Sequence, residues 1–297
     1  MLIAIPFYSN AVFLRETLLS VQGQLDRDFS VVVLDDSVDP REANHARIVV
    51  QECQEWRVRY HRNEKNLGLA GNWNQALELA LAERQDFLVI LHADDRLLPD
   101  YVRRVKQEFY GNPEAEAVFV KTRIINEKGR PVFSFPDFIK ECIRPRGERI
   151  ELRGSSGIGK LIPGDFIFCP TICYRVSAVG TRRFDPARRQ VLDFDWVVRS
   201  LLSNGFWVGL YDQVLFEYRR HSRNTTKLQS QDLSRFIEEM EFYREMSVLL
   251  SGRGENALAA KAERMWIVRL NLGFEALKSF LSFHFTRAWR SIRLIFS

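Results

Sequence analysis

The residues best suited to chemistry are His92, Asp94 and Asp95, which directly follow an apolar run over residues 87–91. Two adjacent carboxylates at the end of a buried strand repel each other and lose hydration, and a bound Mg²⁺ or Mn²⁺ offsets that cost. Such a cation bridges to substrate phosphates and acts as a Lewis acid on a departing diphosphate. The turn therefore predicts a divalent-metal site. An alternative stays open, in which Asp94 or Asp95 caps a helix that begins near Pro99.

Three other expected strands are also followed by residues that suit ligand binding. Their tips read Pro6-Phe7-Tyr8, Asp35-Asp36-Ser37 and Asn66-Leu67-Gly68. In open parallel sheets, ligands collect outside the carboxyl ends of the strands, so we expect the four tips to meet at one edge. An ordinary solvated loop explains any single tip well, but it explains their joint placement poorly.

These tips imply a parallel α/β sheet with crossover helices. In the first hundred residues we expect strands over 2–7, 29–34, 58–60 and 87–91, with a helix over 69–83. Farther along, we expect a strand near 117–122, irregular chain over 129–164, a buried strand over 166–175 and a helix over 194–205. Helix formers dominate from residue 230 onward. The expected division is an α/β domain over residues 1–225 and a C-terminal helical appendage over 226–297.

Six segments resemble, in order, the motifs of the inverting glycosyltransferases of family 2. They read IPFYSNAVFLRETLLSVQGQ, VVVLDDSVD, KNLGLAGNWNQAL, ILHADDRLLPDYV, CPTICYRVSAVGTRRFDPARRQVLDFDWVVRSLLSNG and LFEYRRHSRNTT. The match is collinear from about residue 2 to residue 227. The resemblance implies the GT-A fold, a Rossmann-like, mostly parallel central sheet flanked by helices. It also implies transfer of a sugar from a UDP-, GDP- or dTDP-sugar onto an acceptor hydroxyl.

The resemblance further assigns roles to individual positions. Asp193 falls on the catalytic base, with Asp195 as its acidic neighbour, and Asp94 takes the principal metal-ligand position beside Asp95, with His221 as a later ligand or diphosphate contact. A base that removes the acceptor proton while the oxygen attacks opposite the leaving group gives an inverted product. The nucleotide sugar would be bound by residues from several tips, namely Pro6, Tyr8, Asp35, Asp36, Lys65, Gly68, Asn72, Asp94 and Arg220.

Two positions depart from the family pattern and leave rival functions open. His92 stands where the family often has an acidic residue, although histidine also ligates Mn²⁺. Leu192 stands where glutamate commonly precedes the base. Both departures favour a catalytically impaired, nucleotide-binding scaffold as one alternative. A sugar nucleotidyltransferase is another, but the first strand ends in PFYSN rather than in a Gly-rich phosphate loop.

Composition narrows the classes of protein that remain possible. The chain has 297 residues, 46% of them hydrophobic, and a formal charge of +5, which suit a globular protein and give little support to nucleic-acid binding. No apolar run approaches the roughly 20 residues of a membrane span, and the N-terminus lacks a signal-peptide pattern, so we expect a cytoplasmic protein. The four cysteines lack metal-type spacing and are expected to be buried free thiols. Trp196 lies on an expected helix face and is predicted to pack there. As an alternative, it is close enough to Asp195 to line an acceptor pocket in which a sugar ring stacks.

The segment over residues 274–297 places apolar residues at helical spacing, with Lys278, Arg287, Arg290 and Arg293 interspersed. Such a basic amphipathic helix can lie on an anionic membrane, which would make the protein peripheral on the inner face of the plasma membrane. Packing on the domain or at a dimer interface is the equal alternative. The membrane hypothesis favours a lipid-linked glycan acceptor, as in bacterial surface-polysaccharide transferases.

Overall fold

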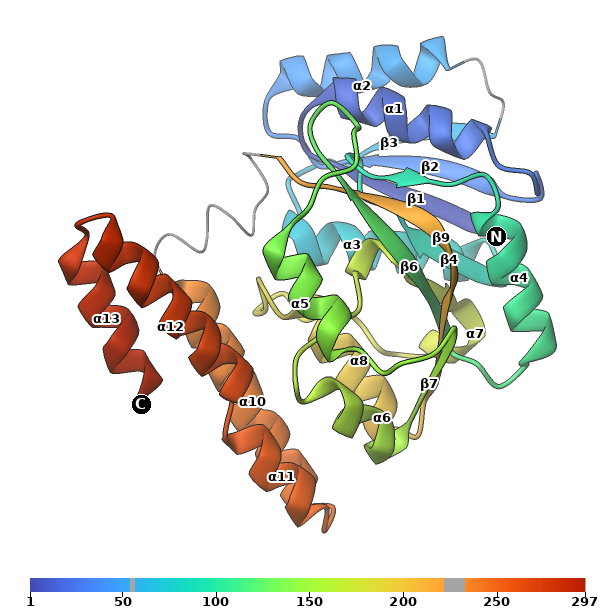
Figure 1. Ribbon diagram of the computed structural model, residues 1–297. Coiled ribbons are helices and arrows are strands. Elements are labelled where there is room, and N and C mark those ends of the chain that lie inside the picture. The colour runs from blue at the N-terminus through green and yellow to red at the C-terminus, as the bar shows by residue number, and fades with distance from the viewer. Residues whose placement is uncertain (54–56, 222–232, 297) are drawn as a thin grey trace.

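The computed structural model describes residues 1–53, 57–221 and 233–296. A central sheet has helices packed on both faces, and further helices from the C-terminal part lie along one side (Figure 1). The strand order is β3-β2-β1-β4-β8-β6-β9-β5, with β7 paired to β9. The expected α/β fold is therefore confirmed.

The N-terminal half of the sheet is the parallel part, and it contains the four strands expected from the sequence. These are β1 (Leu2–Phe7), β2 (Ser30–Asp35), β3 (Val58–Arg62) and β4 (Phe87–Ile90). Their pairing is parallel throughout, so all four carboxyl ends lie at one edge. The crossover helices are α1 (Ala11–Gln22), α2 (Pro40–Glu52) and α3 (Gly68–Ala82).

The other half of the sheet is mixed. Its strands are β5 (Arg96–Leu97), β6 (Ala117–Ile125), β7 (Arg149–Arg153), β8 (Cys173–Arg175) and β9 (Phe206–Arg219). Strand β8 joins the two halves by antiparallel pairing with β4 and β6. The long β9 runs parallel to β6 and antiparallel to β5. It therefore returns the chain to the edge where β4 ends.

Two expectations for the middle of the chain are wrong. Residues 129–164 are not irregular, since they form α5 (Phe135–Ile143), β7 and α6 (Gly154–Leu161). Strand β7 alternates exposed charged residues with buried Ile150 and Leu152, and it is stabilised by pairing with the distant β9. The expected strand over 166–175 is reduced to η1 (Cys169–Thr171) and the short β8, because Pro170 lies inside the 3₁₀ turn.

Side chains of successive strand residues point to opposite faces of the sheet and fill two cores. Ile3 and Ile5 point into the core beneath α1, α2 and α4 (Tyr101–Gly111). Leu2 and Ala4 point into the larger core, which is closed by α3, α6, α7 (Val176–Val179) and α8 (Leu192–Leu202).

The C-terminal helices complete this larger core. They are α10 (Ser234–Ser251), α11 (Asn256–Glu263), α12 (Trp266–Leu281) and α13 (Phe285–Ile295). The ring of Phe242 on α10 lies 5.0 Å from that of Phe194 on α8, and the Tyr243 hydroxyl donates to the Ile162 carbonyl at 3.1 Å. The expected boundary between residues 225 and 226 lies outside the described residues.

The single helix expected over 274–297 is wrong, because the chain turns between α12 and α13. Phe283 in that turn has a φ of 58°, which a continuous α-helix does not allow. No helix within the described part of the chain has the length and apolar content needed to cross a bilayer. All four cysteines are free thiols; Cys173 is buried as expected, whereas Cys142 is exposed.

Candidate active site

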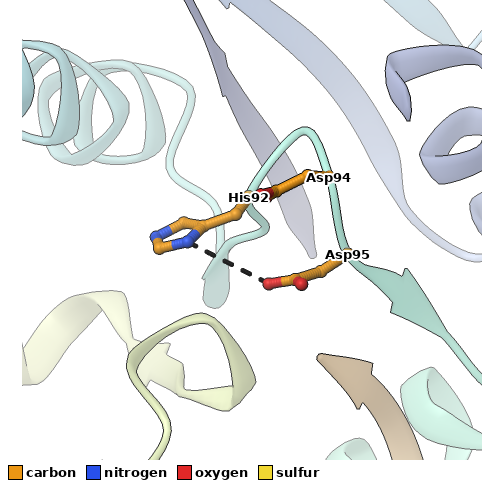
Figure 2. A group of neighbouring side chains, drawn as sticks. All are labelled: His92, Asp94 and Asp95. Carbon is orange, nitrogen blue, oxygen red and sulfur yellow. Dashed lines mark ion pairs between the residues drawn. The ribbon is translucent and has the colours of Figure 1, made fainter. Parts of the chain in front are cut away.

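The turn between β4 and β5 carries the three residues of the expected metal site. Leu91 still pairs with β1, since its amide donates to the Ala4 carbonyl at 2.9 Å, and the amide of Asp95 then donates to the His92 carbonyl at 3.2 Å. This tight turn directs the three side chains toward one another, and the Asp95 carboxylate faces the His92 ring (Figure 2). One ligand atom from each of His92, Asp94 and Asp95 lies within 4.8 Å of the others.

The donor set of this turn fits a divalent cation. Oδ2 of Asp95 is buried and has no hydrogen-bond partner within the described residues, and Nδ1 of His92 lies 4.0 Å from it. Buried polar atoms are rarely left unsatisfied, so this oxygen indicates a missing ligand. Two carboxylates and an imidazole are a donor set that Mn²⁺ accepts, and the carboxylates alone suit Mg²⁺.

The charges of this turn are strongly coupled. Burial and the neighbouring Asp94 charge raise the pKa of Asp95 well above its ordinary value. Burial acts in the same direction on Asp94, but the hydrogen bond from His221 and the nearby His92 outweigh it and hold the pKa of Asp94 below its ordinary value. Burial lowers the pKa of His92, which keeps its imidazole neutral and able to ligate a metal.

Strand β9 supplies the other side of this site. Nε2 of His221 lies 2.8 Å from Oδ2 of Asp94, so the structure brings together residues 127 positions apart. The backbone amide of Arg219 donates to Oδ1 of Asp95 at 2.8 Å, and its Nε donates to the Asp94 carbonyl at 2.7 Å. Arg219 is fully buried and also pairs with Glu16 of α1. It fixes the turn, a role that the sequence analysis did not assign to it.

Arg220 and Lys65, both expected to bind the donor, lie in surroundings that differ from each other. The guanidinium of Arg220 makes two hydrogen bonds to Asp137 on α5, at 3.0 and 2.5 Å. It is therefore held beside the metal turn by an acidic residue that sequence reasoning missed. Lys65 lies exposed in the loop between β3 and α3.

Asp193 occupies the first turn of α8 and lies within electrostatic range of His92. Burial raises the pKa of Asp193, although the charges of Lys140 and His92 and the amide of Phe194 oppose that shift. The carboxylate accepts from the Phe194 amide at 3.0 Å. Asp94 and Asp193, the two expected functional carboxylates, are both close enough to His92 for their charges to oppose the lowering of its pKa.

Asp165 is a second carboxylate near Asp193 that sequence reasoning missed. Burial, together with the charge of Asp193, raises the pKa of Asp165 to about 7, and the charge of Lys140 opposes the rise. Its Oδ1 accepts from the Ile167 amide at 2.9 Å. The segment between α6 and η1 that carries it was expected to begin a strand, so nothing marked this position as part of a site.

Asp195 points away from Asp193. Two residues apart on a helix are separated by about 200°, so their side chains face different sides of α8. Oδ2 of Asp195 accepts from Nε of Arg199 at 2.7 Å, and the carboxylate is buried in that pair. The predicted packing role of Trp196 is confirmed, because its ring is 2% exposed and stacks on Phe184 at 4.5 Å, and the alternative of sugar stacking is wrong.

Asp36, at the tip of β2, has a carboxylate fully engaged by the loop before α3. Oδ1 accepts from Asn63 Nδ2 and the Leu67 amide, both at 2.8 Å, and Oδ2 accepts from Asn66 Nδ2 and the Gly68 amide, both at 2.9 Å. The carboxylate thus caps the N-terminus of α3 from outside the helix. Gly68 has a φ of 69°, which favours glycine.

Neighbouring residues extend this polar network. Asp35 accepts from the Tyr60 hydroxyl and from the Ser37 amide, and burial together with Asp35 raises the pKa of Tyr60 to about 12. Asn72 is buried and bonds to the Leu34 carbonyl at 3.1 Å. Pro6 is partly exposed and Tyr8 is 60% exposed at the end of β1. All these residues lie at the sheet edge where the four tips were expected to meet.

A hollow of about 400 Å³ lies elsewhere, between α1 and α2, and is lined in part by Asn10, Arg15, Glu42 and His45. It contains none of the expected site residues. The carboxylates at the sheet edge are therefore the better candidate for the active site. They combine a buried oxygen that has no hydrogen-bond partner among the described residues with shifted pKa values.

The sequence resembles known sugar-transferring enzymes. A family model described as "Glycosyl transferase family 2" matches residues 2–164, more than half of the chain. An uncharacterized glycosyltransferase of Methanocaldococcus jannaschii is 21% identical over 214 residues, which span 71% of this chain and 67% of that protein. Glucomannan 4-beta-mannosyltransferase 2 of Arabidopsis thaliana is 27% identical over 192 residues, which span 61% of this chain but only 33% of the plant enzyme.

Solved structures with the same fold include two glycosyltransferases. S. aureus TarS in complex with UDP-GlcNAc has a TM-score of 0.65 at 18% identity, covering 94% of this chain and 74% of that one. The mannosyltransferase PcManGT from Pyrobaculum calidifontis, in complex with GDP-Man and Mn²⁺, has a TM-score of 0.59 at 13% identity, covering 99% and 84%. At such low identity the likeness is one of fold.

Proposed function

Because the chain belongs to glycosyl transferase family 2 and has the GT-A fold, we propose that it transfers a sugar from a nucleoside diphosphate sugar to an acceptor hydroxyl with inversion at the anomeric carbon. The observation that carries the proposal is the turn of His92, Asp94 and Asp95, in which Oδ2 of Asp95 is buried and lacks a partner among the described residues. The charge of Asp193 also acts on His92. The fold neighbours solved with UDP-GlcNAc and GDP-Man support this donor class.

The first part of the proposal concerns the donor diphosphate. Asp94, Asp95 and His221 hold Mg²⁺ or Mn²⁺, with His92 as a further nitrogen ligand. When bound, the cation supplies Lewis-acid stabilisation of the departing diphosphate. Mn²⁺ in the PcManGT complex supports this choice of cofactor. Lys65 and Arg220 supply additional positive charge to the diphosphate.

The second part concerns the acceptor. Asp193 removes the acceptor hydroxyl proton as the oxygen attacks the anomeric carbon. Its raised pKa supports this role, because a carboxylate that binds a proton more tightly is a stronger base. Asp195 acts through its pair with Arg199, which keeps α8 and hence Asp193 in place.

The third part concerns the nucleoside. Asp36 positions the loop before α3, while Asp35 with Tyr60 fixes the neighbouring tip of β2. The base and ribose then lie against the edge formed by Pro6, Tyr8, Asp35, Asp36, Gly68 and Asn72.

The rival function is a nucleotide-binding scaffold without catalysis, suggested by His92 and Leu192. Two observations favour an enzyme. The imidazole of His92 is kept neutral by burial, so it retains a ligand lone pair. Leu192 is buried in the larger core, where it anchors α8.

The wider setting is also a proposal. The resemblance to bacterial surface-polysaccharide transferases suggests a glycan or lipid-linked acceptor, with the protein acting at the cytoplasmic side. The Arabidopsis relative is named as a glucomannan mannosyltransferase, which supports a polysaccharide acceptor. Because the chain spans about a third of that enzyme, the full activity of the relative is not carried over.

The proposal is tested by thermal unfolding of the purified protein with UDP-, GDP- and dTDP-sugars, each with and without Mn²⁺. One donor should raise the melting temperature by roughly 5 °C at a concentration of about 100 times its Kd, and only when the metal is present. Asp94→Asn should abolish the metal-dependent part of the rise in melting temperature. The control Asp212→Asn, which changes an ion pair with Arg104 away from the site, should keep it. A shift that is the same without metal, or unchanged in Asp94→Asn, would refute the cation site.

A further inference from the structure

An apolar stripe runs along the outer side of α12. Its residues recur every three or four positions and are 39–69% exposed, namely Trp266, Leu270, Phe274, Leu277 and Leu281. The opposite side of α12 is buried against the rest of the protein through Ile267, Val268 and Leu272. The stripe is therefore not needed to hold the helix in place.

Helix α13 and the turn before it continue this apolar surface. Phe285, Trp289, Ile292 and Phe296 recur at helical spacing and are exposed, while Ala288 and Ser291 between them are buried. Phe283, in the turn, is 81% exposed. We call the exposed apolar residues of α12, α13 and their turn the hairpin surface. Monomeric proteins rarely expose so many large apolar side chains together unless they bind a partner or a membrane.

The charge around the hairpin surface is predominantly positive. Residues 266–296 contain five basic residues and a single acidic one, Glu275. Glu275 is already paired with Arg287 at 2.9 Å. Arg290 and Arg293 are exposed, and Lys278, whose Nζ lies 3.7 Å from Glu275, has a side chain that is 76% exposed. A net positive fringe around exposed aromatic residues suits a negatively charged surface.

The hairpin surface is continuous with α5, next to the candidate active site. The ring of Phe135 on α5 lies 5.9 Å from that of Phe274, and Phe138 on the same helix is half exposed. Asp137, also on α5, holds Arg220 beside the metal turn. One helix thus contacts both the hairpin surface and the site.

We propose that the hairpin surface docks on an anionic phospholipid bilayer, with the aromatic side chains in the headgroup region and Lys278, Arg290 and Arg293 facing the lipid phosphates. A second copy of the chain is a poorer occupant, because pairing two hairpin surfaces would bring their positive fringes together. The inference does not rest on the proposed transfer reaction, since docking requires neither donor nor acceptor.

The test is co-sedimentation of the full chain with vesicles of phosphatidylglycerol and phosphatidylcholine, compared with phosphatidylcholine alone. The wild-type protein should bind the anionic vesicles and be released by 0.5 M salt, a concentration chosen because the Debye length then falls to about 4 Å. Arg290→Glu with Arg293→Glu should weaken binding at least tenfold, since each basic residue contributes about fivefold to partitioning at such a surface. Phe283→Ser with Trp289→Ser should weaken it comparably.

Matched controls separate docking from general charge or apolarity. Arg41→Glu with Arg47→Glu reverses two exposed charges on α2, which lies far from α13 (Figure 1). Val248→Ser with Leu249→Ser removes two exposed apolar residues from α10. Both controls should bind like the wild type. Equal losses in controls and test variants, or no binding to anionic vesicles, would overturn the proposal. The proposal would also be overturned if the protein formed a dimer without lipid and did not bind vesicles, and if Phe283→Ser with Trp289→Ser converted that dimer to a monomer.

Discussion

The pKa of Asp165 shows how strongly the surroundings of a buried carboxylate affect its protonation. Its pKa is raised to about 7 by desolvation and by the charge of Asp193. The folded protein therefore binds a proton at Asp165 that the unfolded chain releases near the ordinary value of 3.8. The stability from this group is fully present below that ordinary value and is lost as the pH rises through about 7.

Asp165→Asn should remove this pH dependence. Between pH 5 and pH 7 the wild-type protein should lose about 2 kcal/mol of unfolding free energy relative to the variant, because the asparagine does not titrate. Urea unfolding at both pH values measures the difference. Asp212→Asn, at a surface ion pair, should follow the wild type. An Asp165→Asn variant whose stability changes with pH as the wild type does would show that Asp165 is ordinarily ionised.

From the sequence, the candidate site residues are those whose types are unusual where they stand. Two adjacent aspartates after an apolar run identified Asp94 and Asp95, and the structure brings His221 to them. Sequence reasoning did not identify Asp137, Asp165 or the role of Arg219, because each acts through contacts with distant strands and helices. Such roles depend on which surfaces the fold brings together, and spacing in the chain does not reveal that.

At the scale of elements, the loop between β3 and α3 depends on one carboxylate. Asp36 accepts four hydrogen bonds, two from asparagine side chains and two from the amides of Leu67 and Gly68. Removing it leaves these donors without an acceptor at the N-terminus of α3. The cost of several such losses in a partly buried position exceeds that of a single exposed helix cap.

Asp36→Ala should therefore lower the free energy of unfolding by about 3 kcal/mol. Asp39→Ala is the matched control, because Asp39 caps α2 through one exposed hydrogen bond from the Arg41 amide and should cost about 1 kcal/mol. Both values come from urea unfolding at one pH. Equal costs for the two variants would mean that the Asp36 network does not hold the loop.

The accuracy of the element predictions follows the strength of the local signal. Continuous apolar runs such as residues 87–91 predicted the parallel strands β1, β2 and β4, since a strand buried on both faces must be apolar throughout. Strand β7 has charged residues at alternate positions and forms only by pairing with β9, so its composition suggested a loop. The break at Phe283 divided an apolar periodicity that continues on both sides of it, and periodicity alone does not show a turn.

At the scale of the molecule, the α/β sheet with its flanking helices and the C-terminal helices share the larger core. Helices α10 and α11 contact α6 and α8, as when Arg253 donates to the Leu202 carbonyl at 2.6 Å. We propose residues 1–225 as the transferase domain and residues 226–297 as a helical appendage that closes this core and carries the hairpin surface. In this arrangement docking and transfer use separate surfaces linked through α5.

The central claim is that a cation held by one turn and a base on another helix act on the same donor and acceptor. The most direct test measures donor binding and sugar transfer together in Asp193→Asn, using the donor found by thermal unfolding. This variant should keep metal-dependent donor binding within about twofold and lose transfer by about 10²- to 10⁴-fold. Transfer at the wild-type rate in Asp193→Asn would contradict the account.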